Sequence, residues 1–318
     1  VSWRIFIRDL DRACSQIING SEVNLGAKSL SYKEWSKGLY ESDKTQSVVD
    51  FWNKNDEMSL SANMLYKDYN NGNGIYDDNI VYEFVYKTNN MEAFKAELNR
   101  VYNTDVSDVL LAAYLNSIKI LAVKDSISVF LESHGRDELD QHIDVSNTIG
   151  WFTSIYPISV CVEHNDISDL VIEVKEKNKK VPYIGIGYGI LRYIYEKGKY
   201  DTDEIAFNYL GDFNNVMNLE NFEEVGQEVD LHVDKERKRP YTLSLECMIV
   251  GNNVKFRLNY SKKQYSQESI REIANRLIDT LHSLFDICSQ KDSAIVSVSD
   301  FGDDELTMDD VDAILNLL

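Results

Sequence analysis

The sequence has few prolines and few cysteines. Only 3 prolines and 4 cysteines occur among 318 residues, so proline-rich linkers are absent. The cysteines are far apart and form no C-x-x-C pair, which argues against a zinc site or a redox motif. They are Cys14, Cys161, Cys247 and Cys288. We therefore expect free thiols in a reducing cytoplasm and no bound metal.

Basic residues and long apolar runs are also scarce. Lys and Arg number 33 against 53 Asp and Glu, which gives a formal net charge of −20. Such an acidic surface repels phosphates, so binding to nucleic acid or anionic membranes is disfavoured. No apolar run approaches the roughly 20 residues of a membrane-spanning helix. The hydrophobic content of 43% is ordinary for a globular protein that buries a core.

Phosphate-binding loops and nucleophile elbows are missing too. The sequence contains no G-x-G-x-x-G after an expected strand, no Walker-type loop and no G-x-S-x-G. The nearest glycine cluster, Gly185-Ile186-Gly187-Tyr188-Gly189, follows no strand and precedes no predicted phosphate-binding helix. Nucleotide binding is therefore disfavoured.

The pattern that is present alternates between strands and helices, which predicts α/β layers. We expect strands at 79–86, 126–131, 204–210, 241–250 and 254–260, the last two joined by a turn at Gly251-Asn252. A first helix is expected from the start of the chain up to Gly20, and further helices at 90–101, 105–120, 166–178, 267–287 and 308–318. The turn-rich stretch 67–78 is a candidate boundary between lobes. Because the helical pattern is already under way at Val1, we expect that a segment precedes it.

The segment from Leu131 to Asp137 is the best candidate for chemistry. An apolar strand ends there, and Glu132, His134 and Arg136 follow within five residues. A carboxyl group beside an apolar wall has a raised pKa, which suits a general acid or base. The alternative is that Glu132 and Arg136 form a structural ion pair at a turn.

Two further runs admit both a structural and a functional interpretation. The aromatic run 148–157, which contains Trp151 and Tyr156, is either core packing or the wall of a pocket. Asn208 lies in an expected buried strand, where an amide must find partners, so it belongs either to a hydrogen-bond network or to a ligand site. The other histidines are expected to be solvated or to pack structurally; they are His142, His164, His232 and His282.

Taken in order, these runs resemble the motif series of epimerization domains of nonribosomal peptide synthetases. Val1 to Ile5 resembles the end of HHxxxDGVSWRIL, and 132–137 resembles EGHGRE. The remaining matches are 102–111 to YNTxxxDLLL, 147–157 to RTVGWFTxxYP, 181–189 to PxxGxGYG, and 207–211 to FNYLG. The departures from these motifs include Ser133 in place of Gly, Asp137 in place of Glu and Asn147 in place of Arg.

The resemblance implies a chloramphenicol-acetyltransferase-like α/β fold with two lobes in a V, the first lobe incomplete here. It implies inversion at Cα of an aminoacyl or peptidyl thioester on the phosphopantetheine arm of an upstream carrier domain, with no cofactor held by the domain itself. Glu132 would be one acid/base group, and the second would be a motif histidine just before Val1. Asn208 and Tyr209 would line the site, Trp151 and Tyr156 would shape the tunnel, and His134 and Arg136 would orient Glu132.

The same resemblance predicts three segments along the chain. Residues 1–70 would complete the first lobe, 71–290 would form the second, and 291–318 would be an acidic tail with a short helix. That helix would either dock on a basic segment of the next synthetase or pack on its own domain. A condensation domain that forms peptide bonds is the alternative within the same fold, and a non-catalytic docking module is the alternative outside enzymes.

Overall fold

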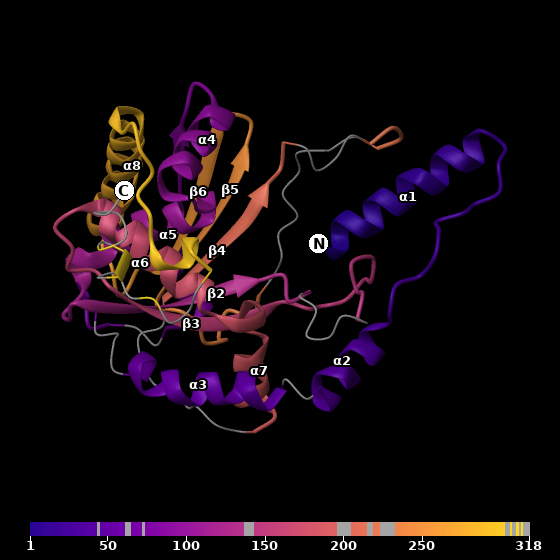
Figure 1. Cartoon of the computed structure of the whole chain (residues 1–318), viewed down its shortest axis with the longest axis horizontal. Helices are drawn as coiled ribbons and strands as arrows, with labels where there is room; N and C mark the ends of the chain where they lie inside the picture. Colours follow the sequence, from indigo (N-terminus) through magenta and orange to yellow (C-terminus); the bar gives the residue numbers. More distant parts are fainter. Residues whose placement is uncertain are drawn as a thin grey trace.

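The computed structural model describes residues 1–42, 45–60, 65–71, 74–136, 143–195, 205–214, 219–222, 233–302, 306, 310–311 and 313, with the backbone alone at 54–60. Within these residues the strands form one six-stranded sheet in the order β1-β6-β5-β4-β2-β3 (Figure 1). The strands are β1 (Asn79–Lys87), β2 (Ser126–Ser133), β3 (Ser154–Cys161), β4 (Ile205–Asp212), β5 (Leu243–Val250) and β6 (Asn253–Ser261).

Strand β4 is the strand at which the pairing changes from antiparallel to parallel. It runs parallel to both of its neighbours, β2 and β5, whereas the other pairs are antiparallel. The β5–β6 hairpin turns at Gly251 and Asn252, and Gly251 adopts the positive φ of +60° that such a turn requires. The polar ends of β2 and β4 therefore lie side by side, which brings two separate motifs together.

Four helices cover one face of the sheet (Figure 1): α4 (Met91–Tyr102), α5 (Val106–Ile118), α6 (Ile167–Lys179) and α8 (Gln267–Gln290). Ser266 caps the start of α8, because its side chain accepts a hydrogen bond from the Ser269 N–H, and the apolar stripe of the helix is buried from Ile270 to Leu284. α5 is apolar almost all round, because it lies between the sheet and α8.

Two helices pack near β3 and contact the other face: α3 (Thr45–Leu60) and α7 (Ile186–Tyr193). Contacts between aromatic rings join the sheet to the helices on each of its two faces. Phe207 stacks on Tyr114 of α5, whereas Phe130 meets Tyr188 of α7 edge to face. α1 (Ser2–Ile18) projects away from the sheet, and α2 (Tyr32–Glu41) lies between α1 and α3 (Figure 1).

Short 3-10 turns complete the fold: η1 (Tyr76–Asp78), η2 (Lys119–Leu121), η3 (Pro182–Gly185) and η4 (Val298–Asp300). None of the helices in the described part of the chain is long and apolar enough to cross a membrane.

The predicted α/β layers are confirmed, and each strand expected from the sequence is present. Four elements were not predicted: α2, α3, β3 and α7. The helix expected at 308–318 falls mostly outside the described residues, where only 310, 311 and 313 are helical. Val311 is fully buried, which favours packing of this segment on its own domain. The division into 1–70, 71–290 and 291–318 stays a prediction.

Candidate active site at the end of strand β2

Glu132 is the second-to-last residue of β2, and it lines two cavities at this end of the strand. Its side chain is half-buried, and Asn208 on β4 donates a hydrogen bond from Nδ2 to Glu132 Oε2 at 2.8 Å. Burial raises the pKa of Glu132, and the nearby charge of Glu246 raises it further. The carboxyl group is therefore held in place and poised to carry a proton closer to neutral pH than an ordinary glutamate.

Glu132 forms a wall shared by two cavities. The first has a volume of about 290 Å³ and lies against Asn208, Glu246 and Arg239. The second, of about 480 Å³, is lined by His134, Tyr156 and Tyr209 and also by Val1 and Arg4 at the start of the chain. Glu132 thus lines both cavities, and its carboxyl lies on the side of the first, where Asn208 binds it.

Asn208 and Tyr209 are neighbours in sequence but face different sides of β4, as successive strand residues do. Asn208 binds Glu132 beside the first cavity, and Tyr209 lines the second. Burial raises the pKa of Tyr209 to about 12, with the Asp212 charge adding to the effect. The phenol therefore stays protonated at neutral pH and can donate a hydrogen bond.

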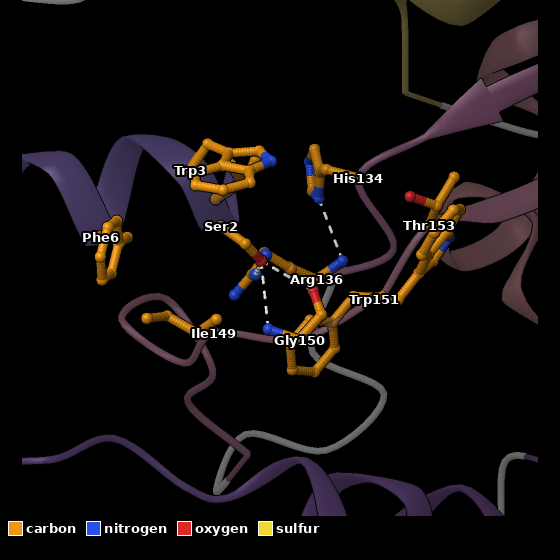
Figure 2. A pocket seen from close by; sticks show the side chains of 11 residues that line it. Ser2, Trp3, Phe6, His134, Arg136, Ile149, Gly150, Trp151 and Thr153 are labelled. Carbon is orange, nitrogen blue, oxygen red and sulfur yellow. Dashed lines mark hydrogen bonds between the residues drawn. The ribbon is translucent and has the colours of Figure 1, made fainter. Parts of the chain in front are cut away.

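Arg136 connects the loop after β2 to the start of the chain. Its guanidinium donates to Ser2 Oγ at 3.1 Å and to the Val145 carbonyl, and it lies 4.2 Å from the centroid of the Phe152 ring. Figure 2 shows Ser2 between Arg136 and Gly150, whose N–H donates to the same hydroxyl at 3.1 Å. Three of the motif segments thus meet at one serine.

His134 points back onto this loop, where its Nδ1 accepts a hydrogen bond from the Arg136 N–H at 3.0 Å (Figure 2). No ion pair joins Glu132 to Arg136 among the residues that the structure describes, so the alternative of a structural ion pair is not observed. The contacts of His134 and Arg136 fix the strand end. No hydrogen bond or ion pair from either side chain to Glu132 is found in the described part of the chain.

The two aromatic residues expected to shape the tunnel lie in different surroundings. Trp151 is 83% exposed and lines a third cavity, of about 580 Å³, with Trp3 and Phe6 of α1 (Figure 2). Tyr156 is buried on β3 and forms part of the wall of the cavity that holds Tyr209. Only Tyr156 therefore shares a cavity with Glu132.

The glycines of the motif segments allow close packing. Gly135 has φ +61°, and a Cβ there would lie 1.7 Å from the Phe152 carbonyl oxygen. A Cβ on Gly185, at φ +75°, would lie 1.9 Å from the Tyr156 ring. Ser133, in contrast, lies in regular β2 opposite Ser154, so its Cβ is accommodated. Asn147 accepts a hydrogen bond from Arg8, and Asp137 lies outside the described residues.

Cys161, His164 and Glu173 gather at the far end of β3, with one potential metal-ligand atom of each within 4.8 Å of the others. Both carboxylate oxygens of Glu173 are engaged, one by the Cys161 N–H at 2.9 Å and the other by His164 Nε2 at 2.6 Å. His164 is thus partly buried and bonded, not simply solvated as expected. This arrangement ties the β3–α6 loop to α6.

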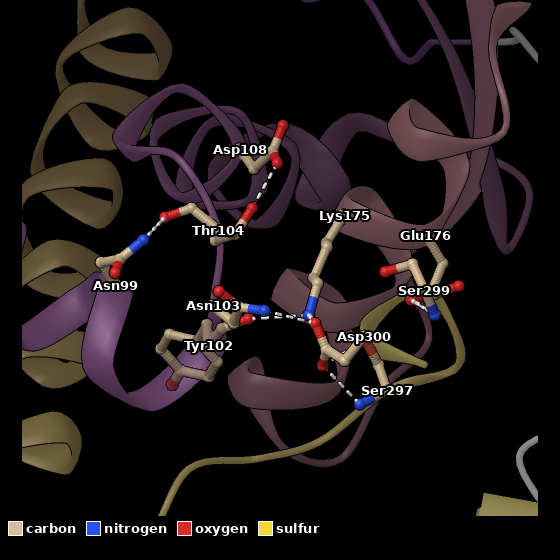
Figure 3. Close-up of polar contacts among 10 residues, drawn as sticks. All are labelled: Asn99, Tyr102, Asn103, Thr104, Asp108, Lys175, Glu176, Ser297, Ser299 and Asp300. Carbon is tan, nitrogen blue, oxygen red and sulfur yellow. Dashed lines mark hydrogen bonds and ion pairs between the residues drawn. The ribbon is translucent and has the colours of Figure 1, made fainter. Parts of the chain in front are cut away.

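The segment resembling YNTxxxDLLL carries a second polar cluster (Figure 3). Asn103 adopts the left-handed φ of +46° at the end of α4 and donates to Asp300 at 2.7 Å. The fully buried Lys175 donates to Asp300 at 2.6 Å and to the Tyr102 carbonyl at 3.0 Å. Together these contacts fasten residues 297–300 to α4 and α6.

Sequence reasoning missed Lys175 and Glu246. Lys175 stands on the inward face of a predicted helix, and a lysine at an apolar position was the available signal. Glu246 alternates with apolar residues on β5, as any solvent-facing strand residue does, so nothing in the sequence distinguished it.

Comparison with known proteins places this geometry in a family. The model of the condensation domain matches residues 1–307, so the chain belongs to the condensation-domain family. It is 28% identical to bacitracin synthase 2 of Bacillus licheniformis over 99% of its length, and 28% identical to surfactin synthase subunit 1 of Bacillus subtilis (strain 168) over 100%. The chain spans only 12% and 9% of those two proteins.

Solved structures agree. The epimerization domain from the third module of tyrocidine synthetase B superposes with a TM-score of 0.81 at 27% identity, over 91% of this chain and 67% of that one. The condensation domain of the enacyloxin polyketide synthase shares the fold, with a TM-score of 0.63 at 12% identity over 93% of this chain and 57% of the other. The fold class predicted from the motif series is confirmed.

Proposed function

We propose that this chain supplies part of an active site that inverts the Cα centre of an aminoacyl or peptidyl thioester in nonribosomal peptide synthesis. The observation that carries the proposal is Glu132: its half-buried carboxyl is fixed by Asn208, and the residue lines two cavities. Its raised pKa suits proton transfer near neutral pH. The motif series and the 27% identity to an epimerization domain support the same assignment.

The reaction needs two proton-transfer groups on opposite faces of Cα. One group removes the Cα proton, and its electron pair passes to the thioester carbonyl as an enolate. The other group then delivers a proton to the opposite face, and the carbonyl re-forms with the centre inverted. Glu132 is one of these groups, and it acts as acid in one direction of the reaction and as base in the other.

The second proton-transfer group would be the histidine of the HHxxxDG motif, which the resemblance places directly before Val1. Val1 lines the cavity of about 480 Å³ that Glu132 also lines, so a residue just ahead of it would lie near that cavity. The protonated Tyr209 in the same cavity is positioned to donate to the enolate oxygen.

The substrate would be carried on the phosphopantetheine arm of an upstream peptidyl carrier domain, and no cofactor would be held by the domain itself. A partner on the next synthetase, bound through 303–318, belongs to the same proposal. Peptide-bond formation is the second candidate function, because the matching family model is that of the condensation domain.

The decisive experiment measures loss of deuterium from Cα of an amino acid loaded on the carrier domain of the synthetase that contains this chain. Glu132→Gln should slow exchange by about 10²–10⁴-fold, the usual contribution of a general acid or base. The exposed Glu163→Gln is the matched control and should exchange at the wild-type rate. Exchange retained in Glu132→Gln would remove Glu132 from the mechanism, and a peptide product from two loaded carriers without exchange would favour condensation.

A further inference from the structure

Polar side chains follow one another across the sheet on the face opposite α5, one from each of five strands. Asn208 pairs in register with Glu246, Glu246 with Arg257, and Arg257 with Glu83. The parallel pairing of Leu131 with Phe207 sets Glu132 beside Asn208 at the other end. We call these five residues the polar row; it runs from Glu132 on β2 to Glu83 on the edge strand β1.

The contacts along the polar row are uneven. Asn208 lies 2.8 Å from Glu132, Arg257 Nε lies 3.2 Å from Glu83, and Arg257 Nη1 lies 3.8 Å from Glu246. Arg257 thus holds Glu83 more closely than Glu246, and the Glu246 carboxylate is only partly offset. Glu246 also lines the cavity of about 290 Å³ that Glu132 and Asn208 line.

We infer that Glu246 is a positioning residue for Glu132: from the strand beyond Asn208 its negative charge favours the protonated form of the Glu132 carboxyl, and Arg257 limits that effect. The inference rests on the proposed function for its catalytic meaning. Neighbouring strands lie about 4.8 Å apart, which separates the two backbones by roughly 10 Å. Over such a distance, at an effective dielectric constant near 20, two unit charges interact by an amount that matters for proton affinity. The rise in the pKa of Glu132, which burial and then Glu246 cause, agrees with this.

Other titratable and charged groups also face Glu132, so the test must isolate Glu246. The first cavity presents Arg239, Tyr76 and Tyr241. The second presents Arg4 from α1, Asp105 and Asp108 from the start of α5, His134, Tyr156 and Tyr209. Glu246 differs from all of them because it is the register partner of the amide that binds Glu132.

The experiment titrates Glu132 directly by carbon-13 NMR of the chain labelled at the glutamate carboxyl carbon. The Glu132 signal is the one lost in Glu132→Gln, so its assignment needs no activity. Glu246→Gln should lower its midpoint by about 0.5–1 pH unit. Arg257→Gln should raise the midpoint, because Glu246 then loses its counter-charge. Glu83→Gln should lower it slightly, because Arg257 is then free to pair with Glu246.

Glu246→Asp, which keeps the charge, should retain most of the wild-type shift and serves as the control for packing. Unchanged midpoints in Glu246→Gln and Arg257→Gln, or shifts of the same sign in both, would overturn the inference. In the intact synthetase, the rate of Cα deuterium exchange is plotted against pH. The pH at which this rate changes because Glu132 titrates should shift in the same direction as the NMR midpoint. If the wild-type synthetase shows no exchange, the proposed function fails, while the NMR titration still decides the role of Glu246.

Discussion

Glu132 and Asp300 are both partly buried carboxyl groups, and their surroundings move their pKa values in opposite directions. Burial raises the pKa of Glu132, and the carboxylate Glu246 adds to the rise. Burial would also raise the pKa of Asp300, but hydrogen bonds from Lys175, the Ser297 N–H and Asn103 outweigh it and lower the pKa. One carboxyl is thus suited to proton transfer, whereas the other stabilises the fold as an ion pair. The direction of the pKa shift depends on whether a cation lies beside the carboxyl.

The largest expected effect is the loss of folding stability when the ion pair between Lys175 and Asp300 is broken. Lys175→Met should cost about 3–5 kcal/mol of stability, because it removes the fully buried cation and leaves the partly buried Asp300 unpaired. Urea denaturation measures the loss, and Lys179→Met, which changes an exposed lysine on the same helix, should leave the midpoint close to that of the wild type. A loss below 1 kcal/mol would show that residues 297–300 are not held by this ion pair.

A smaller effect is expected from the amide that holds Glu132. Asn208→Leu removes the hydrogen bond to Glu132 Oε2, and hydrogen bonds to charged groups contribute about 1.5–3 kcal/mol. Deuterium exchange should therefore slow by about 10- to 100-fold. Asn89→Leu, at an exposed turn, is the control. A wild-type rate in Asn208→Leu would mean that Glu132 is positioned without its amide partner.

The smallest expected effect is a difference between Asp300 and Glu132 in how each changes the folding stability with pH. The lowered pKa of Asp300 gives stability that is present above the unfolded pKa and lost as pH falls through the folded one. The raised pKa of Glu132 works in the other direction, because ionising the buried group destabilises the fold as pH rises through the unfolded pKa towards the folded one.

Urea midpoints at pH 3.5, 5 and 8 measure both. Asp300→Asn should lose most relative to wild type at pH 5 and 8 and least at pH 3.5. Glu132→Gln should gain relative to wild type as the pH rises from 5 to 8. The same sign of pH dependence in both variants would contradict the comparison between the two carboxyls.

Much of the fold could be predicted because its elements carry strong local signals. The β5–β6 hairpin has its Gly-Asn turn, and α8 has both a serine cap and a continuous apolar stripe. The missed elements lack such signals. β3 contains Pro157, which an edge strand tolerates. α7 is only eight residues long and contains Gly187 and Gly189, and α3 shows little separation of polar and apolar faces.

The site was predictable only in part. Glu132 and Asn208 belong to motif segments, and the resemblance pointed to both before the structure joined them. The expected action of His134 and Arg136 on Glu132 is not seen as contact, because their side chains turn towards Ser2, Val145 and the loop itself. The place of Glu246 beside Asn208 could not be predicted, because it follows from the register between β4 and β5. That register depends on pairing between distant parts of the chain.

The strand order has a consequence for how the chain is made. Edge strand β1 pairs residues 79–87 with residues 253–261, so it leaves the ribosome long before its partner exists. At about 5–20 residues per second, β1 waits roughly ten seconds or more with an unpaired edge. Strand β2 likewise waits for β4. These edges therefore stay unpaired during synthesis, and an unpaired strand edge is a site where chains aggregate before the finished fold can form.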